Sequence, residues 1–83
     1  EELTYDAVRL GPNPATTSLT AVVEVNAQVA RVLLCDALGR VRRDLPMPAS
    51  GTVVLDIGDL PSGMHLLRFQ GPNGQLERRF VKL

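Results

Sequence analysis

Apolar and polar residues alternate with a period of two along much of this chain. Leu19, Ala21 and Val23 are separated by residues that would lie on the opposite side of an extended segment. The same alternation recurs at residues 53–57 and 65–69. A period of two is typical of a β-strand with one buried face, and we find no sustained helical period over ten or more residues. The pattern therefore predicts an all-β domain.

Turn-forming residues divide the chain into short segments rich in valine, leucine and threonine. Glycine, proline and asparagine recur about every 8–12 residues, a spacing typical of β-sandwiches and barrels. We therefore predict seven strands. They should cover residues 4–10, 19–26, 29–36, 40–45, 52–57, 63–70 and 75–83.

Two hairpins are expected from their turn residues. Asp36-Ala37-Leu38-Gly39 should join segments 29–36 and 40–45, with Gly39 supplying a positive φ at a bulge. Asn73-Gly74 is the strongest short hairpin signal in the chain, and should join 63–70 to 75–83. Both pairs of segments are therefore expected to be antiparallel neighbours.

Composition limits the classes of function. A chain of 83 residues with 45% apolar residues makes one globular domain. Nine basic residues balance nine acidic ones, which argues against binding to nucleic acid or to an anionic membrane surface. The apolar stretches are too short for membrane insertion. No signal peptide begins the chain, so an export signal would have to lie upstream.

Candidate chemistry is sparse. His65 is the single residue that could act as a general base at neutral pH, and no serine or cysteine stands at a motif-like distance from it. Cys35 is the single cysteine and lies among apolar residues, so we interpret it as a small buried side chain. We predict structural roles for both residues. We expect no enzymatic activity, no cofactor and no bound metal.

Three aspartates and three arginines are candidate ligand residues. Asp36, Asp56 and Asp59 could suggest a calcium loop, but they lie in different segments, so turn and cap roles are favoured. Arg40, Arg42 and Arg43 could bind an anion; a solvated face of an edge strand is the favoured interpretation, since edge charges discourage unwanted strand pairing.

Several motifs follow one another in a recognisable order. Pro12-Asn13-Pro14 should form a stiff extended turn, because its prolines fix φ. The hairpin Asp36-x-x-Gly39-Arg40 follows, then a strand after Gly63, then Phe80-Val81-Lys82-Leu83. Over about residues 5–83 this order resembles the type A C-terminal sorting domain of type IX secretion cargo from Bacteroidetes. The family usually has tyrosine where this chain has His65.

The resemblance implies a seven-stranded, immunoglobulin-like, antiparallel β-sandwich. It also implies a secretion address: residues 1–83 form a single C-terminal sorting domain that is covalently linked to a cargo upstream. The cargo would pass through the periplasm and reach the cell surface or the medium. The implied partners are the outer-membrane type IX translocon, its shuttle proteins and a sortase-like peptidase that removes the domain. The positions carried over by motif are Pro12, Asn13, Pro14, Asp36, Gly39, Arg40, Gly63 and the terminal Val81-Lys82-Leu83, with His65 as the departure.

The basic terminal strand 75–83 and its hairpin partner are our hypothesis for the surface that the translocon recognises. Main-chain pairing with a partner strand is one mode by which it could be read. The residues proposed for it are Arg78, Arg79, Val81, Lys82 and Leu83. Gly39 and Gly63 should act through the fold and not through this interface. The competing functions are an immunoglobulin-like binding or adhesion module and a structural accessory of a secreted enzyme. The scarcity of aromatic residues weakens the carbohydrate-binding version of the first.

Overall fold

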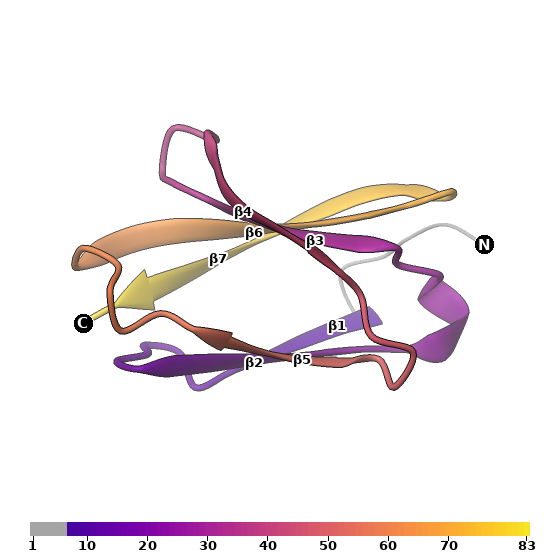
Figure 1. Ribbon diagram of the computed structural model, residues 1–83, viewed down its shortest axis with the longest axis horizontal. Helices are drawn as coiled ribbons and strands as arrows, with labels where there is room; N and C mark the ends of the chain where they lie inside the picture. Colours follow the sequence, from indigo (N-terminus) through magenta and orange to yellow (C-terminus); the bar gives the residue numbers. More distant parts are fainter. Residues whose placement is uncertain (1–6) are drawn as a thin grey trace.

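A computed structural model describes residues 7–83 of the chain, apart from the side chain of Val25. The seven strands form two antiparallel sheets that pack face to face (Figure 1). The three-stranded sheet has the order β1 (Val8–Gly11), β2 (Ser18–Val23) and β5 (Thr52–Asp56). The four-stranded sheet has the order β4 (Val41–Pro46), β3 (Arg31–Cys35), β6 (Gly63–Gly71) and β7 (Gly74–Lys82).

The predicted number of strands and the all-β class are confirmed. The part of the first predicted strand at residues 4–6 lies outside the described residues. One prediction was wrong in detail: the second strand ends at Val23, and a 3₁₀ turn follows at Val25–Ala27. The Ala27 N–H donates to the Glu24 carbonyl in this turn (3.0 Å). The turn lies where the chain crosses from one sheet to the other.

The core fills the space between the sheets and follows the period of two. Leu19 and Ala21 from β2, Leu55 from β5, and Leu67 and Phe69 from β6 are buried. Strand β3 departs from simple alternation. Val32 and Leu34 are buried in the core. Leu33 and Cys35, on the outer side of the sheet, are buried as well. Strand β3 lies between β4 and β6, so both of its edges are paired within the sheet.

The first predicted hairpin is confirmed. In the β3–β4 turn the Asp36 carbonyl accepts the Gly39 N–H (2.9 Å), and the Asp36 N–H donates to the Arg40 carbonyl (2.9 Å). Gly39 has a φ of 86°. This combination is a type I turn closed by a glycine bulge, which requires a residue that tolerates positive φ.

The second hairpin joins β6 to β7 as expected, but its turn lies one residue earlier. Gly71 pairs with Gly74, so Pro72 and Asn73 form the loop. Pro72 favours the first loop position because its φ is already fixed near the value that a type I turn requires. A Cβ on Gly71 would lie 2.2 Å from the Gln28 carbonyl oxygen, so this glycine also permits a close approach of two backbones.

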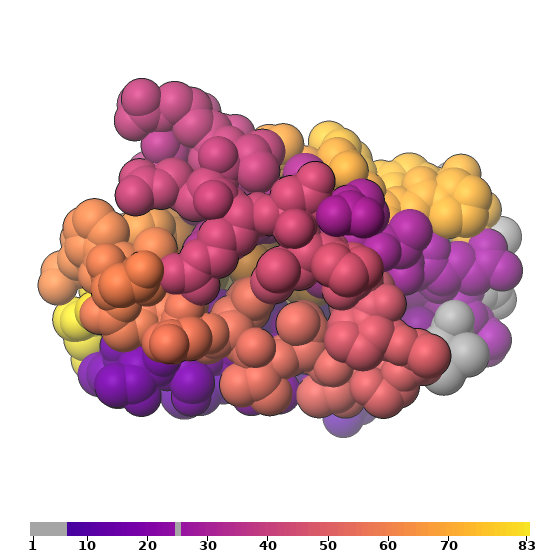
Figure 2. All heavy atoms as spheres, in the orientation of Figure 1, coloured from indigo at the N-terminus to yellow at the C-terminus, as the bar shows by residue number. Residues whose placement is uncertain are grey.

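The front of the sandwich is covered by the chain around residues 40–50, as the space-filling view shows (Figure 2). The side chain of Arg43 in β4 reaches Asp59, with a nitrogen to oxygen distance of 2.7 Å, and also donates to the Asp56 carbonyl. This contact ties the β4 edge to the β5–β6 connection. In the described part of the chain there is no helix of the length and apolar character that a membrane span needs.

Candidate functional site

The two sides of the terminal strand β7 have different environments. Strand β7 is an edge strand, and its Cα partners on β6 place Met64 opposite Val81 and His65 opposite Phe80. Side chains of a strand alternate between its faces. Phe80 and Lys82 are buried on the side of the core, whereas Arg79 and Val81 are exposed on the outer face.

Two of the basic residues proposed for recognition lie on the core side. The Lys82 ammonium donates to the carbonyl oxygens of Leu60 and Leu83, each at 3.2 Å, and the residue is 9% exposed. The half-buried Arg78 donates to the Val8 carbonyl of the opposite sheet at 2.6 Å. Both cations therefore join β7 to neighbouring elements. Of the proposed set, the structure leaves these on the surface: Arg79, Val81 and Leu83.

The segment Asn13–Ala15, which we call the clamp, pairs with the end of β7. The Asn13 side-chain oxygen accepts the Val81 N–H (3.1 Å), and the Ala15 N–H donates to the Val81 carbonyl (2.9 Å). The Leu83 N–H then donates to the Ala15 carbonyl (2.9 Å). This is a short parallel pairing beside Lys82. A partner strand that paired with the backbone at Val81–Leu83 would first have to displace the clamp.

The clamp overlaps the Pro12-Asn13-Pro14 turn that the sequence singled out. The peptide bonds before Pro12 and before Pro14 are both cis. Ala15 is 1% exposed and was not among the predicted residues. The proline-rich sequence indicated the turn, but the partner of Asn13 lies 68 residues away, so no local pattern could identify it.

The residues of the Asp36-x-x-Gly39-Arg40 motif hold one another. One Asp36 oxygen accepts the N–H groups of Leu38 (3.0 Å) and Arg40 (2.9 Å), and the other accepts the Arg40 guanidinium (2.7 Å). Hydrogen bonding by the Arg40 backbone, above all, lowers the pKa of the Asp36 carboxyl. The turn and cap role favoured for Asp36 is confirmed.

Gly63 and His65 begin the strand that pairs with β7. Gly63 has a φ of 128°, which a residue with a Cβ rarely adopts. The His65 ring is 6% exposed and stacks on Phe80, with ring centroids 5.5 Å apart. Its Nε2 lies 2.8 Å from the Pro61 carbonyl oxygen and must carry the proton that this contact needs. Nδ1 is buried without a partner among the described residues.

The remaining candidates also have structural partners. The Asp56 side chain accepts the Gly58 N–H (3.1 Å), and Asp59 pairs with Arg43, which lowers the Asp59 pKa. Cys35 is fully buried, and burial raises the pKa of its thiol, which disfavours the nucleophilic thiolate. Arg42 is exposed on β4, an edge strand, as the favoured interpretation of the arginine cluster expects.

An open hollow of about 400 Å³ lies on the outer face of the four-stranded sheet. Sequence reasoning missed it because it combines residues from the β3–β4 turn with residues of β6 and β7. Met64 and Leu66 were the available signal, since these two outward positions of β6 carry apolar residues where a solvated face would be polar. The hollow is lined by Ala37, Met64, Leu66, Glu77 and Arg79.

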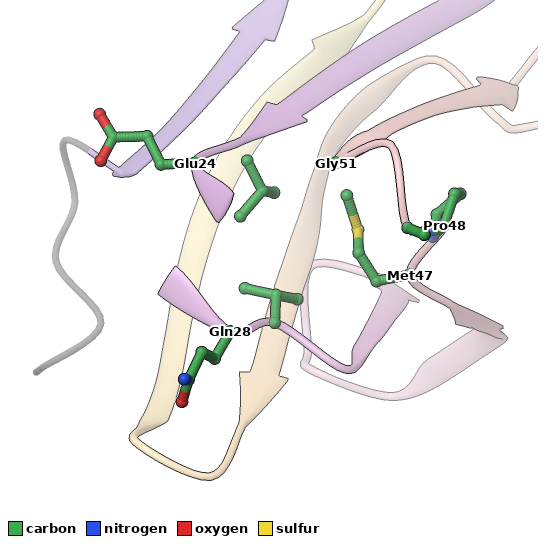
Figure 3. A pocket seen from close by; sticks show the side chains of 8 residues that line it. Glu24, Gln28, Met47, Pro48 and Gly51 are labelled. Carbon is green, nitrogen blue, oxygen red and sulfur yellow. The ribbon is translucent and has the colours of Figure 1, made fainter. Parts of the chain in front are cut away.

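A smaller pocket of about 160 Å³ opens where β2, the 3₁₀ turn and the β4–β5 connection meet (Figure 3). The polar ends of Glu24 and Gln28 point away from Met47 in this view. Its volume lies below the range of about 300–1,000 Å³ that is usual for small-molecule sites. The pocket is lined by Val23, Glu24, Gln28, Val29, Met47, Pro48, Ala49 and Gly51.

Comparisons with known proteins agree with this architecture. Residues 10–83 match the family described as "Secretion system C-terminal sorting domain". No curated protein matches the chain. Among solved structures, a DUF3244 family protein from Bacteroides vulgatus with an immunoglobulin-like β-sandwich fold is similar. It has a TM-score of 0.70 and 22% sequence identity, and the alignment covers 93% of this chain and 84% of that one. The likeness confirms the predicted immunoglobulin-like sandwich.

Proposed function

The chain belongs to the family of secretion system C-terminal sorting domains, and we propose that it is the signal that directs its attached cargo across the outer membrane through the type IX system. Membership implies a type IX sorting signal, export to the cell surface or the extracellular space, contact with the secretion machinery and attachment to a cargo. Family and fold together favour a non-enzymatic module. The observation that carries the proposal is the match over residues 10–83, which contains the clamp, both hairpins and β7.

The finer steps of this route are part of the proposal. Residues 1–83 act as a single module at the C-terminal end of the cargo, and the fusion passes through the periplasm before it meets the outer-membrane translocon and its shuttle proteins. A sortase-like peptidase at the cell surface then cuts upstream of the domain. Comparison of the mass of the exported reporter in strains with and without that peptidase tests the last step; an unchanged mass would contradict it.

The surface that the translocon reads is the outer face of the terminal strand. Arg79, Val81 and Leu83 are exposed there, which supports a contact through side chains. Lys82 and Arg78 contribute indirectly, because they hold β7 on the sandwich. Removal of the last two residues is therefore a poor test, since it would also remove the hydrogen bond between Leu83 and the clamp.

A localisation assay tests the proposal. Residues 1–83 are appended through a flexible linker to a periplasm-targeted reporter, in a bacterium with an intact type IX system and in a strain that lacks the translocon. We expect reporter at the surface or in the medium of the intact strain alone. Retention in the periplasm of both strains, with the domain shown to be folded, would contradict the proposal and favour a binding or accessory module.

A further inference from the structure

We propose that the outer face of β6 and β7 is a docking patch for a protein segment of the secretion machinery that presents an apolar side chain beside a carboxylate. The patch consists of Met64, Leu66, Arg79 and Val81 around the hollow described above. The inference rests on the proposed sorting function and adds to it the side chains that make the contact and the chemistry of the partner.

The register of the two strands assembles the patch. Met64 lies opposite Val81, and Leu66 lies opposite Arg79, so the four side chains share one face. Met64 is 45% exposed and Val81 is 43% exposed, although both are apolar. Ala37 of the β3–β4 turn also lines the hollow. The result is an open concave site with an apolar wall, which fits an inserted apolar side chain.

The charge beside the hollow sets the second requirement on the partner. Glu77 lines the hollow, but its carboxylate accepts two hydrogen bonds from the Arg68 guanidinium, at 2.8 and 3.1 Å. Arg79 takes part in none of the ion pairs found among residues 7–83. The hollow therefore presents one uncompensated positive charge next to apolar surface. A carboxylate is the complementary group, and arginine suits it because its guanidinium can donate two hydrogen bonds.

The contacts of the clamp indicate that the partner recognises side chains and does not pair with the strand edge. Asn13 and Ala15 already bind the N–H and carbonyl groups of Val81 that face away from β6. Strand addition at this end would break those hydrogen bonds. The same contacts hold the backbone of β7 in place, so binding to the outer face requires no further ordering of the strand itself.

Two variants and two matched controls in the reporter fusion test the patch. Met64→Asp places a charge in its apolar part, and Arg79→Glu reverses its charge. Val54→Asp and Arg9→Glu make the same changes at exposed positions of the other sheet. We expect exported reporter to fall at least about tenfold for the two patch variants, the loss typical of a residue central to an interface, and to change less than about twofold for the controls.

The carboxylate is tested separately. Arg79→Lys keeps the positive charge, whereas Arg79→Met keeps a long side chain without it. We expect the lysine variant to be exported several-fold better than the methionine variant. Equal export of the two would overturn the inferred carboxylate.

The melting temperature of each isolated domain is measured to establish that it is folded. If Met64→Asp fails to fold, Arg79→Glu alone tests the patch. Arg79 makes no ion pair in the described structure, so its replacement breaks none. Export of the parent fusion without the translocon would contradict the sorting proposal itself. Normal export of the parent together with equal export of all four variants would overturn the patch alone. Sedimentation shows whether the parent domain forms a dimer. If it does, and if Met64→Asp makes it monomeric without loss of export, the proposed docking patch would also be overturned.

Discussion

The core side and the outer side of β7 are built from similar residues that have different roles. On the core side, Phe80 packs under His65 and Lys82 binds backbone carbonyls. On the outer side, Val81 and Arg79 face solvent beside the hollow. A domain of 83 residues has a small surface. Because side chains alternate between the two faces of a strand, one face of β7 can pack in the core while the other forms an interface. Charge or hydrophobicity alone therefore does not reveal which residues a partner reads.

The β3–β4 turn shows the same division. Asp36 and Gly39 hold the conformation of the turn, whereas Leu38 is 80% exposed and Ala37 lines the hollow. Substitutions that build the fold should lower stability first and export only as a consequence. Substitutions on the outer side should do the reverse.

The largest effect on stability is expected for Phe80→Ala. Phe80 is 1% exposed, so its truncation removes buried apolar area and leaves a cavity under His65. We expect a loss of about 3–5 kcal/mol in the free energy of unfolding, measured by urea titration. The neighbouring Val81→Ala should change it by no more than about 0.5 kcal/mol. Similar losses for the two variants would contradict the division of β7.

Lys82→Ala should have the next largest effect. It removes the donor that satisfies the Leu60 carbonyl and leaves space where the aliphatic stem was packed. We expect a loss of about 1–3 kcal/mol in the same titration. Arg79→Ala removes a cation of the same strand from the outer side and serves as the control, with an expected change within about 0.5 kcal/mol. A neutral Lys82→Ala would mean that the buried cation is not structural.

Gly39→Val should lower the free energy of unfolding by a similar amount. The backbone φ of 86° strains a β-branched residue, and the nearest atom to an added Cβ would be an Arg68 nitrogen at 3.7 Å, so strain and not collision is the cause. About 1–3 kcal/mol is expected. For a domain of this size, each kilocalorie lowers the melting temperature by roughly 4–8 °C. Leu38→Ala, at an exposed position of the same turn, is the control. An unaltered melting temperature for Gly39→Val would contradict the account.

The smallest effect concerns acid pH. The pKa of Asp36 is lowered in the folded state, mainly by the Arg40 backbone N–H. A carboxyl with a depressed pKa stabilises the fold fully above its unfolded-state pKa, and that stabilisation is lost as pH falls through the folded-state value. We therefore expect stability to decline below about pH 4. Asp36→Asn should show a shallower decline between pH 5 and pH 2, followed by thermal unfolding. Identical slopes would exclude this contribution.

Local pattern predicted most of the fold. The alternation at Leu19, Ala21 and Val23, and the turn chemistry of Asp36 and Gly39, depend on neighbours in sequence, and these predictions were confirmed. The β6–β7 turn was displaced by one residue, because the prediction gave weight to Asn73-Gly74 and not to Pro72.

The surface was harder to predict, for physical reasons. The clamp joins Asn13 to Val81, and the hollow joins Ala37 to Arg79; both depend on how strands are ordered in space. The side of the strand on which Arg78 lies could have been predicted from the sequence. It has the same parity as Phe80, and a buried phenylalanine places that side of the strand against the core.

Arg78 and Arg79 offer the most direct test of the central claim, because they are adjacent, identical and on opposite sides of β7. Each is replaced by glutamine in the reporter fusion, and export and melting temperature are both measured. We expect Arg78→Gln to lower the melting temperature, through loss of its contact with the Val8 carbonyl, while export per folded molecule is retained. Arg79→Gln should lower export at an unchanged melting temperature. Normal export of Arg79→Gln, or a parallel fall of both quantities in both variants, would contradict the claim that the outer side of the terminal strand is the surface that the secretion machinery reads.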